Sequence, residues 1–271
     1  MLVIVRQPAA AFRDAISNHP GHHRIDASRA RTQHAAFCAA LEEAGLSLLR
    51  LPEERDLPDA TFVSDSLVAL APLLPGRSPL VVVARPAISS RRLEVDSVLR
   101  AALPCLPAET QVVRVEDPGT LEGGDVVVYG DRIAIGLSGR TNALGARVLA
   151  DAARGLGYRP FLCPVPDRLH LATAVTALDP HTLIGTGGGF ASLDAAGTDP
   201  APAGEIRRLM LPDDELLGAN VLALGGHAFL GLRNPTAARL LREIGMPVHE
   251  LELDEFALAD GGPTCLVNVL P

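Results

Sequence analysis

The sequence predicts an α/β protein built as a closed five-bladed α/β propeller with fivefold pseudosymmetry. The first observation is a unit between Thr120 and Asn142, in which Gly130-Asp131 joins two apolar runs that are followed by a helical pattern. The second is that other segments repeat this order of runs and turns while sharing little sequence. The third is that a strand from each end of the chain completes the fifth unit. A repeat of this kind predicts the architecture without reference to any single residue.

Each unit is expected to hold a hairpin, a helix and a third strand. The hairpins are predicted at Ser66–Ala71 with Leu80–Ala84, Val126–Tyr129 with Ile133–Leu137, Ala174–Leu178 with Thr182–Thr186, Asn220–Leu224 with Ala228–Leu232, and Cys265–Leu270 with Leu2–Val5. Apolar residues at helical spacing predict helices at Ala27–Ala44, Arg91–Leu103, Asn142–Leu156 and Thr236–Ile244. Third strands are predicted at Leu46–Leu51, Gln111–Val115, Arg159–Val165, Ile206–Leu211 and Val248–Leu253. A Gly/Ala/Pro-rich stretch, Gly187–Gly204, obscures the helix of one unit.

Length and composition favour one domain over residues 1–271. A chain of 271 residues with 48% hydrophobic content can bury a sizeable core, although the repeats cannot fold alone. The net charge of −8 and the lack of a basic run argue against nucleic acid and anionic membranes, and favour a small cationic or zwitterionic ligand. No stretch resembles a signal peptide or a transmembrane span, so a cytoplasmic protein is expected. A homodimer is left open.

The four cysteines do not form a structural framework. They lie far apart and contain no CxxC pair, so neither a zinc knuckle nor a set of disulfides is indicated. Cys38, Cys105 and Cys163 lie in apolar runs or at the ends of elements, where a cysteine acts as a small buried hydrophobe.

The loops that lead into the hairpins carry an unusual share of reactive side chains. In a propeller these loops meet at the axis, so residues far apart in the sequence converge there. The side chains expected at one cavity are Asp59, Asp65, Glu122, His170, Asp213 or Asp214, Asp260 and Cys265. A thiol, an imidazole and several carboxylates suit attack by a thiolate, proton transfer by the histidine and binding of a cationic substrate.

Each of these residues also has a structural explanation. Cys265 taken alone is more often a packed thiol, and His170 between two leucines could be a structural histidine. Glu122 could belong to a glycine-rich turn, and Asp213-Asp214 could cap a helix. The structural explanation does not account for three reactive residue types at the same place in three repeats, and the catalytic interpretation is therefore preferred.

Six motifs in order resemble the dimethylarginine dimethylaminohydrolases, a family of the pentein superfamily of guanidino-group modifying enzymes. The motifs are FVSD, LEGGDV, GLSGRTN, HLAT, LPDDELLGAN and the terminal DGGPTC. The resemblance covers nearly the whole chain and implies the pentein fold, a fivefold α/β propeller. It also implies hydrolysis of asymmetric dimethylarginine and monomethylarginine to citrulline and dimethylamine or methylamine. The route would pass through a covalent thiouronium intermediate on cysteine, without a metal or an organic cofactor.

The resemblance assigns a role to individual positions. Cys265 would be the nucleophile, His170 the acid and base, and Glu122 the residue that orients His170 and stabilises its charged form. The substrate-binding residues that it implies are Asp65 for the guanidinium nitrogens, Asp59 for the α-amino group, Arg85 and Arg140 for the α-carboxylate, and Phe62 beside the methyl groups.

The loop Ser17–Asp26 matches the family's mobile lid in position. It contains His19, His22 and His23, which invite a metal interpretation. Scattered histidines in an exposed loop are more often solvated, and no cysteine or acidic ligand pattern surrounds these three, so no metal site is expected.

One position departs from the family pattern. Ser64 stands in FVSD where the family usually has a glutamate. A carboxylate about 4 Å from a guanidinium is worth about 4 kcal/mol at an effective dielectric near 20, so its loss bears on the substrate. Two alternatives to a dimethylarginine hydrolase therefore stay open: a pentein hydrolase for another substituted guanidine or amidine, and a catalytically silent protein that binds arginine derivatives. Retention of Cys265, His170 and Glu122 speaks against the silent protein.

Overall fold

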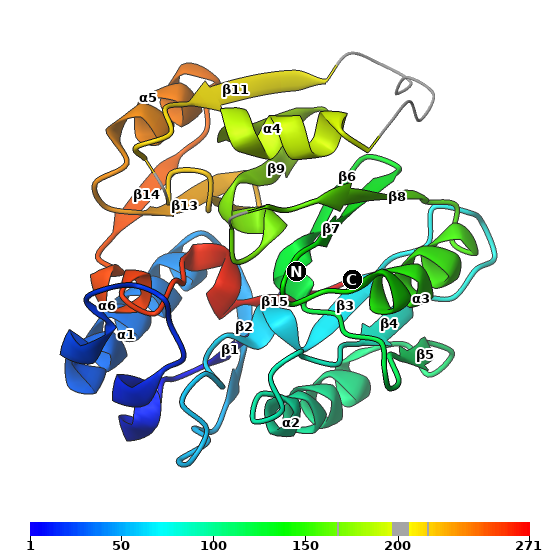
Figure 1. Ribbon diagram of the computed structural model, residues 1–271, viewed down its shortest axis with the longest axis horizontal. Coiled ribbons are helices and arrows are strands. Elements are labelled where there is room, and N and C mark those ends of the chain that lie inside the picture. The colour runs from blue at the N-terminus through cyan, green and yellow to red at the C-terminus, as the bar shows by residue number, and fades with distance from the viewer. Residues whose placement is uncertain (167, 197–205, 216) are drawn as a thin grey trace.

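The computed structural model describes residues 1–166, 168–196, 206–215 and 217–271 and contains five three-stranded sheets around a common centre (Figure 1). The strand orders are β15-β1-β2, β3-β4-β5, β6-β7-β8, β9-β10-β11 and β12-β13-β14. In each sheet the first strand runs antiparallel to the second, and the second runs parallel to the third. The predicted five-bladed α/β propeller is confirmed.

The strands and helices lie close to the positions that the sequence predicts. The strands are β1 (Leu2–Arg6), β2 (Ser47–Leu51), β3 (Leu67–Leu70), β4 (Leu80–Val83), β5 (Gln111–Arg114), β6 (Val126–Tyr129), β7 (Arg132–Leu137), β8 (Arg159–Pro164), β9 (Val175–Asp179), β10 (Thr182–Thr186), β11 (Arg207–Leu211), β12 (Leu222–Leu224), β13 (His227–Gly231), β14 (Val248–Leu251) and β15 (Asn268–Leu270). The α-helices are α1 (Ala27–Glu43), α2 (Arg92–Ala102), α3 (Ala143–Arg154), α4 (Gly187–Asp194), α5 (Pro235–Glu243) and α6 (Asp254–Ala257).

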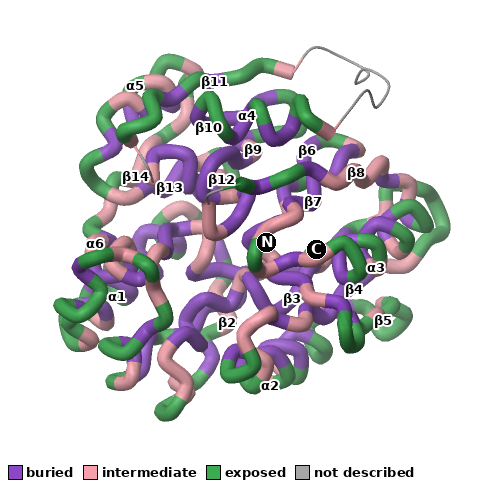
Figure 2. The backbone as a smooth tube through the Cα atoms, in the orientation of Figure 1, coloured by how far each residue is buried: buried purple, intermediate pink, exposed green. Residues whose placement is uncertain are grey.

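A helix connects the second strand of each sheet to its third strand. Parallel neighbours need such a crossover, and α1 to α5 supply one for each sheet in turn. The helix that composition obscured is α4, whose first turn is capped by the side chain of Thr186. Residues 197–204 of that glycine- and alanine-rich stretch lie outside the described residues. Figure 2 shows buried backbone around the centre and exposed residues on the peripheral helices.

The five first strands surround the propeller axis. Residues of β3, β6, β9, β12 and β15 all line one axial cavity of about 380 Å³. Strands from the two ends of the chain pair in the fifth sheet, where Leu2 faces Leu270. The ring is therefore closed by the pairing of the termini, as the repeat pattern predicts.

Two of the differences from the predicted boundaries concern the site. Cys265 was expected to begin a strand, but it lies in a 3-10 turn, Pro263–Leu266, because its N–H donates to the carbonyl of Gly262 at 3.0 Å. Helix α3 was expected to begin at Asn142, but Asn142 caps it instead by accepting from the N–H of Gly145 at 2.9 Å. Both Cys265 and Arg140 therefore lie in loops.

No helix in the described part of the chain is long and apolar enough to cross a membrane.

Helix α3 illustrates how a helix is attached to its blade. Its inner face buries Ala146, Leu149 and Ala153 in one apolar cluster with Ile133 and Ile135 of β7. Its outer face carries Leu144, which is 49% exposed. The helix is therefore held by one apolar stripe.

We expect Leu149→Ala to lower the free energy of unfolding by about 2–5 kcal/mol, because it removes a fully buried side chain and leaves a cavity. Leu144→Ala is the matched control on the exposed face, with an expected change within about 0.5 kcal/mol. Urea denaturation of both variants measures the difference. Equal losses would contradict the assignment of the buried face.

Candidate active site

Four single turns of 3-10 helix gather reactive side chains at one end of the axis. The turns are η3 (Val63–Asp65), η5 (Gly123–Asp125), η6 (Leu171–Thr173) and η7 (Pro263–Leu266). Turn η3 contacts both η5 and η7, and η5 contacts η6. The small cavity at this place is lined by Asp59, Phe62, Asp65, Arg91, Arg140, His170 and Cys265, with Ile16, Leu169, Ala259, Asp260 and Gly261. The convergence that the repeat predicts therefore occurs for most of the expected residues.

His170 and Glu122 form a buried pair. The imidazole Nε2 lies 2.9 Å from a carboxylate oxygen of Glu122, and the side chains are 4% and 0% exposed. Gly124 permits this approach, because a Cβ there would lie 2.5 Å from Nδ1 of His170. Burial alone would lower the pKa of His170, but Asp65 and the hydrogen bond to Glu122 raise it to about 9. His170 is therefore protonated at neutral pH.

Arg91 is the central cation of the site, and sequence reasoning placed it only at the start of a helix. Its guanidinium lies 2.9 Å from Asp65, 3.2 Å from Glu94 and 3.4 Å from Glu122, with 5% of its side chain exposed. A positive charge at a helix N-terminus is electrostatically unfavourable. The position of Arg91 at the start of a predicted helix could therefore have indicated a role at the site. Burial would lower the pKa of Arg91, but these carboxylates raise it.

Arg85 does not line the cavity. It follows β4 at a backbone bridge to Leu121, so its side chain lies along the neighbouring loop. There it forms an ion pair with Asp117, which is exposed, and donates to the carbonyl of Gly119 at 3.0 Å. The arginine that the structure brings to the cavity from this segment is Arg91.

Asp65 is held in place from several sides. It accepts a hydrogen bond from the N–H of Gly124 at 2.8 Å and pairs with Arg91. Burial would raise the pKa of Asp65, but His170 and Arg91 outweigh burial and lower it. Asp65 therefore presents a stable negative charge to the cavity.

The rim of the cavity contains Asp59, Phe62 and Arg140. Asp59 accepts from the N–H of Ile16 at 3.2 Å, and burial raises the pKa of its carboxyl. Phe62 packs edge-on against Phe12, with ring centroids 5.8 Å apart. Arg140 lies 3.4 Å from Glu122 and also lines a larger outer cavity of about 850 Å³.

The start of the segment predicted as a lid contacts Asp260, which lines the inner cavity. Asp260 accepts from the hydroxyl of Ser17 at 2.9 Å and from the N–H of Asn18 at 2.7 Å. Ile16 lines the inner cavity, while Asn18 and His19 line the outer one. About 20 Å³ of the inner cavity is open to water, which is room for about one water molecule.

The thiol of Cys265 is positioned by Asn220, a buried residue that sequence reasoning did not select. Its Nδ2 donates to the sulfur at 3.8 Å, and its Oδ1 accepts from the N–H and the hydroxyl of Thr264 at 3.0 and 2.9 Å. Burial, followed by the charge of Asp65, raises the pKa of Cys265, against opposing contacts from Gly262, Asn220 and Thr264. The LPDDELLGAN motif thus contributes Asn220, whereas Asp213 and Asp214 do not line the cavity.

Ser64 lies on the other side of the converging turns. It lines the axial cavity between the first strands, and its buried hydroxyl has no hydrogen-bond partner among the described residues. The backbone is tight here, because a Cβ on Gly123 would lie 2.0 Å from the carbonyl oxygen of Ser64. Ser64 is absent from the lining of the cavity that contains Cys265.

The one group in the described residues that could chelate a metal coincides with the site. Ligand atoms of Asp65, Glu122 and His170 lie within 4.8 Å of one another. The guanidinium of Arg91 lies against both carboxylates and supplies positive charge there. The three lid histidines are not part of such a group.

Comparison with known proteins agrees with the motifs. A scan against protein-family models finds no match. The chain is 34% identical over 269 residues to an N(G),N(G)-dimethylarginine dimethylaminohydrolase of Streptomyces coelicolor, covering 97% of this chain and 94% of the relative.

The chain belongs to the dimethylarginine dimethylaminohydrolase family.

Its relative from Pseudomonas aeruginosa is 27% identical, with 97% of each chain covered. A solved structure of a cysteine-to-serine mutant of that dimethylarginine dimethylaminohydrolase, in complex with citrulline, matches with a TM-score of 0.84, covering 98% of this chain and 97% of that one. A dimethylarginine dimethylaminohydrolase adduct with S-methyl-L-thiocitrulline matches with a TM-score of 0.85, 27% identity and 98% of both chains covered. The N-terminal domain of the arginine dihydrolase ArgZ, at 17% identity and a TM-score of 0.80, shares the fold, covering 100% of this chain and 99% of that chain. The family therefore accounts for the pentein propeller.

The raised pKa of His170 predicts a specific dependence of stability on pH. The unfolded histidine titrates near 6.5 and the folded one near 9, so the protonated state stabilises the fold below 6.5 and this stabilisation is lost as pH rises through 9. Between pH 7 and pH 9.5 we expect the free energy of unfolding of the wild type to fall by about 2 kcal/mol more than that of the His170→Gln variant. Urea unfolding at several pH values measures this difference. If the free energies of unfolding of the two proteins changed equally with pH, the result would contradict a charged His170.

The buried charges around Arg91 predict that this arginine is essential to the fold of the site. Arg91→Met leaves Asp65, Glu94 and Glu122 without their cation and should cost about 3–5 kcal/mol of unfolding free energy. Arg85→Met is the matched control, because the partner of Arg85 is 79% exposed, and it should cost about 1 kcal/mol or less. Thermal and urea denaturation compare the two. A larger loss for Arg85→Met would reverse the assignment of the two arginines.

Proposed function

We propose that this protein hydrolyses asymmetric dimethylarginine and monomethylarginine to citrulline and dimethylamine or methylamine. The observation that carries the proposal is the convergence of Cys265, the His170–Glu122 pair and Asp65 on one buried cavity. The family membership supports the substrate class, since relatives along the whole chain carry this activity in their names. The citrulline complex and the S-methyl-L-thiocitrulline adduct of two related structures support the product and a covalent route.

In the first half of the reaction the sulfur of Cys265 attacks the guanidinium carbon. Burial and the charge of Asp65 raise the pKa of Cys265 and favour its thiol, so this thiol must lose its proton to the solvent as the substrate binds. A cationic guanidinium held by Asp65 lies beside the sulfur and favours the thiolate. The C–N bond to the methylated nitrogen breaks, and His170 donates its proton to the departing amine. A thiouronium remains on Cys265.

In the second half a water molecule replaces the sulfur. The neutral His170 left by the first half accepts a proton from this water, which attacks the thiouronium carbon. The C–S bond breaks, the second proton of the water is lost to the solvent, the thiolate of Cys265 is released and citrulline leaves. Glu122 keeps the imidazole oriented and stabilises its charged form in both halves, through the 2.9 Å contact.

The rest of the substrate has complementary partners at the rim. Asp59 suits the α-amino group, Arg140 suits the α-carboxylate, and Phe62 offers an apolar surface to the methyl groups. Since the inner cavity has room for about one water molecule, the substrate must displace the Ser17–Asn18 segment from Asp260 to enter. The loop Ser17–Asp26 is thus proposed as a lid.

The alternatives have less support. A larger N-substituent would need space near Ser64, but Ser64 faces the axial cavity instead. A silent binding protein would not need the protonated His170 and the Cys265 thiol at one cavity. The net charge of −8 favours a small cationic or zwitterionic substrate over nucleic acid as the partner. The protein is proposed to be cytoplasmic.

The test is turnover on a panel of methylated arginines, with release of citrulline and amine as the readout. We expect the wild type to act on mono- and asymmetric dimethylarginine and Cys265→Ser to lose at least about 10³-fold in kcat, because the covalent route needs a thiolate. Cys38→Ser, which changes a buried thiol outside the site, is the control. A wild type inactive on both substrates, or an active Cys265→Ser, would overturn the proposal.

A further inference from the structure

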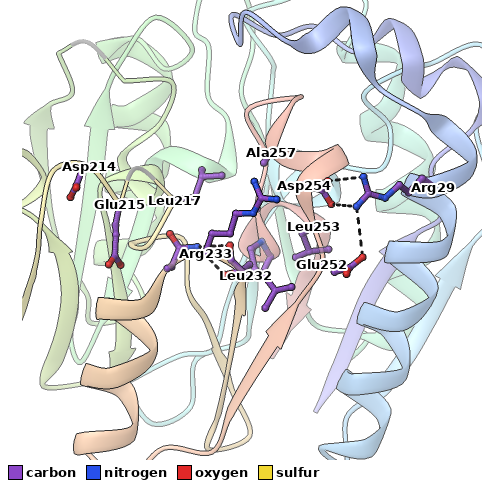
Figure 3. A pocket seen from close by; sticks show the side chains of 15 residues that line it. Arg29, Asp214, Glu215, Leu217, Leu232, Arg233, Glu252, Leu253, Asp254 and Ala257 are labelled. Atoms are coloured by element: carbon purple, nitrogen blue, oxygen red, sulfur yellow. Dashed lines mark hydrogen bonds and ion pairs between the residues drawn. The ribbon is translucent and has the colours of Figure 1, made fainter.

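A second cavity of about 320 Å³ lies behind the loop that holds Cys265 (Figure 3). Its walls come from α1, the segment before β12, the turn between β13 and α5, the segment from β14 through α6, and Gly261–Pro263. Gly261 lines both this cavity and the one that contains Cys265. The two cavities are therefore separated by the backbone of one loop.

Arg233 lines this cavity and is itself exposed to solvent. It lies between β13 and α5 with φ of 74°, a left-handed conformation that is uncommon for residues other than glycine. Figure 3 shows its side chain crossing the cavity toward Ala257, with Asp214 and Glu215 on one side and Glu252 and Asp254 on the other. The side chain of Arg233 has no hydrogen bond or ion pair with another described residue, whereas Arg29 across the cavity is paired with Asp254 at 2.8 Å.

The acids of the lining are not all occupied. Glu215 caps α5 by accepting from the N–H groups of Thr236 and Ala237 at 2.8 and 3.1 Å, and Asp254 pairs with Arg29. Asp214 has no partner among the described residues. Glu252 is 67% exposed and lies 3.7 Å from Arg29. The cavity thus offers the unpaired guanidinium of Arg233, the unpaired carboxylate of Asp214 and the carboxylate of Glu252, which is shared with Arg29. Leu217, Leu232, Leu253 and Ala257 form an apolar wall.

We infer that this cavity binds a small α-amino acid with an aliphatic side chain. The guanidinium fork of Arg233 matches a carboxylate in two parallel hydrogen bonds, and the available carboxylates match an ammonium group. A simple anion would meet the repulsion of four acids in the lining, and a simple amine would meet Arg233. A zwitterion satisfies both charges, and its side chain lies against the leucines.

Binding is measured without reference to turnover, so the experiment tests this site independently of the hydrolase activity. L-norleucine is the probe, because it has both charges and an aliphatic chain but no guanidinium for Asp65. Calorimetric titration should detect a norleucine site that Arg233→Gln weakens at least tenfold and Arg233→Lys weakens less. Arg239→Gln is the matched control on α5, where the arginine is exposed and pairs with Glu243 at 2.6 Å, and it should bind as the wild type does.

Two further measurements separate this cavity from the catalytic one. Asp59→Asn should leave the norleucine site intact, because Asp59 lines only the cavity with Cys265. Hexanoate, which lacks the ammonium, and pentylamine, which lacks the carboxylate, should each bind the wild type at least tenfold more weakly than norleucine. Norleucine binding that survives Arg233→Gln but is lost in Asp59→Asn, or no binding at all, would overturn the inference, as would equal binding of hexanoate.

Discussion

The buried guanidinium of Arg91 is the interaction on which the site depends. Asp65, Glu94 and Glu122 come from separate segments, and without a cation their like charges would resist ionisation in so enclosed a place. His170 and Arg91 together lower the pKa of Asp65, and the charge of Asp65 in turn helps to keep His170 protonated. At Glu94 burial has a larger effect than the charge of Arg91 and raises the pKa of Glu94 to about 7. The acid–base state of the whole site therefore depends on one arginine at the start of α2.

The backbone sets a second constraint, because the loops approach one another more closely than side chains allow. A Cβ on Gly124 would meet the ring of His170, one on Gly261 would meet the ring of Phe62 at 2.5 Å, and one on Gly262 would meet the side chain of Asn220 at 2.6 Å. The glycine pairs in LEGGDV and DGGPTC are thus required by packing at the axis. Gly261 also lines the second cavity, so the loop that precedes Cys265 borders both cavities.

The repeat pattern made the fold predictable, since each blade encodes the same periodicity and the termini pair only if the ring closes. It also predicted that Cys265, His170, Glu122 and Asp65 converge, because equivalent loops meet at the axis. It could not distinguish Arg85 from Arg91, since that depends on how a polar loop turns between β4 and α2. It missed Asn220 for a related reason. An uncharged amide carries no chemical signal in the sequence until its hydrogen bonds to Thr264 and Cys265 are visible.

The electrostatics of the site favour a neutral thiol at Cys265. His170 is already protonated at neutral pH and cannot accept the proton of Cys265, while burial and Asp65 hold that thiol neutral. A guanidinium about 4 Å from the sulfur is worth about 4 kcal/mol at an effective dielectric near 20, which corresponds to about three pH units. A bound guanidinium would therefore favour the thiolate of Cys265. A neutral urea such as citrulline carries no charge and would not favour it.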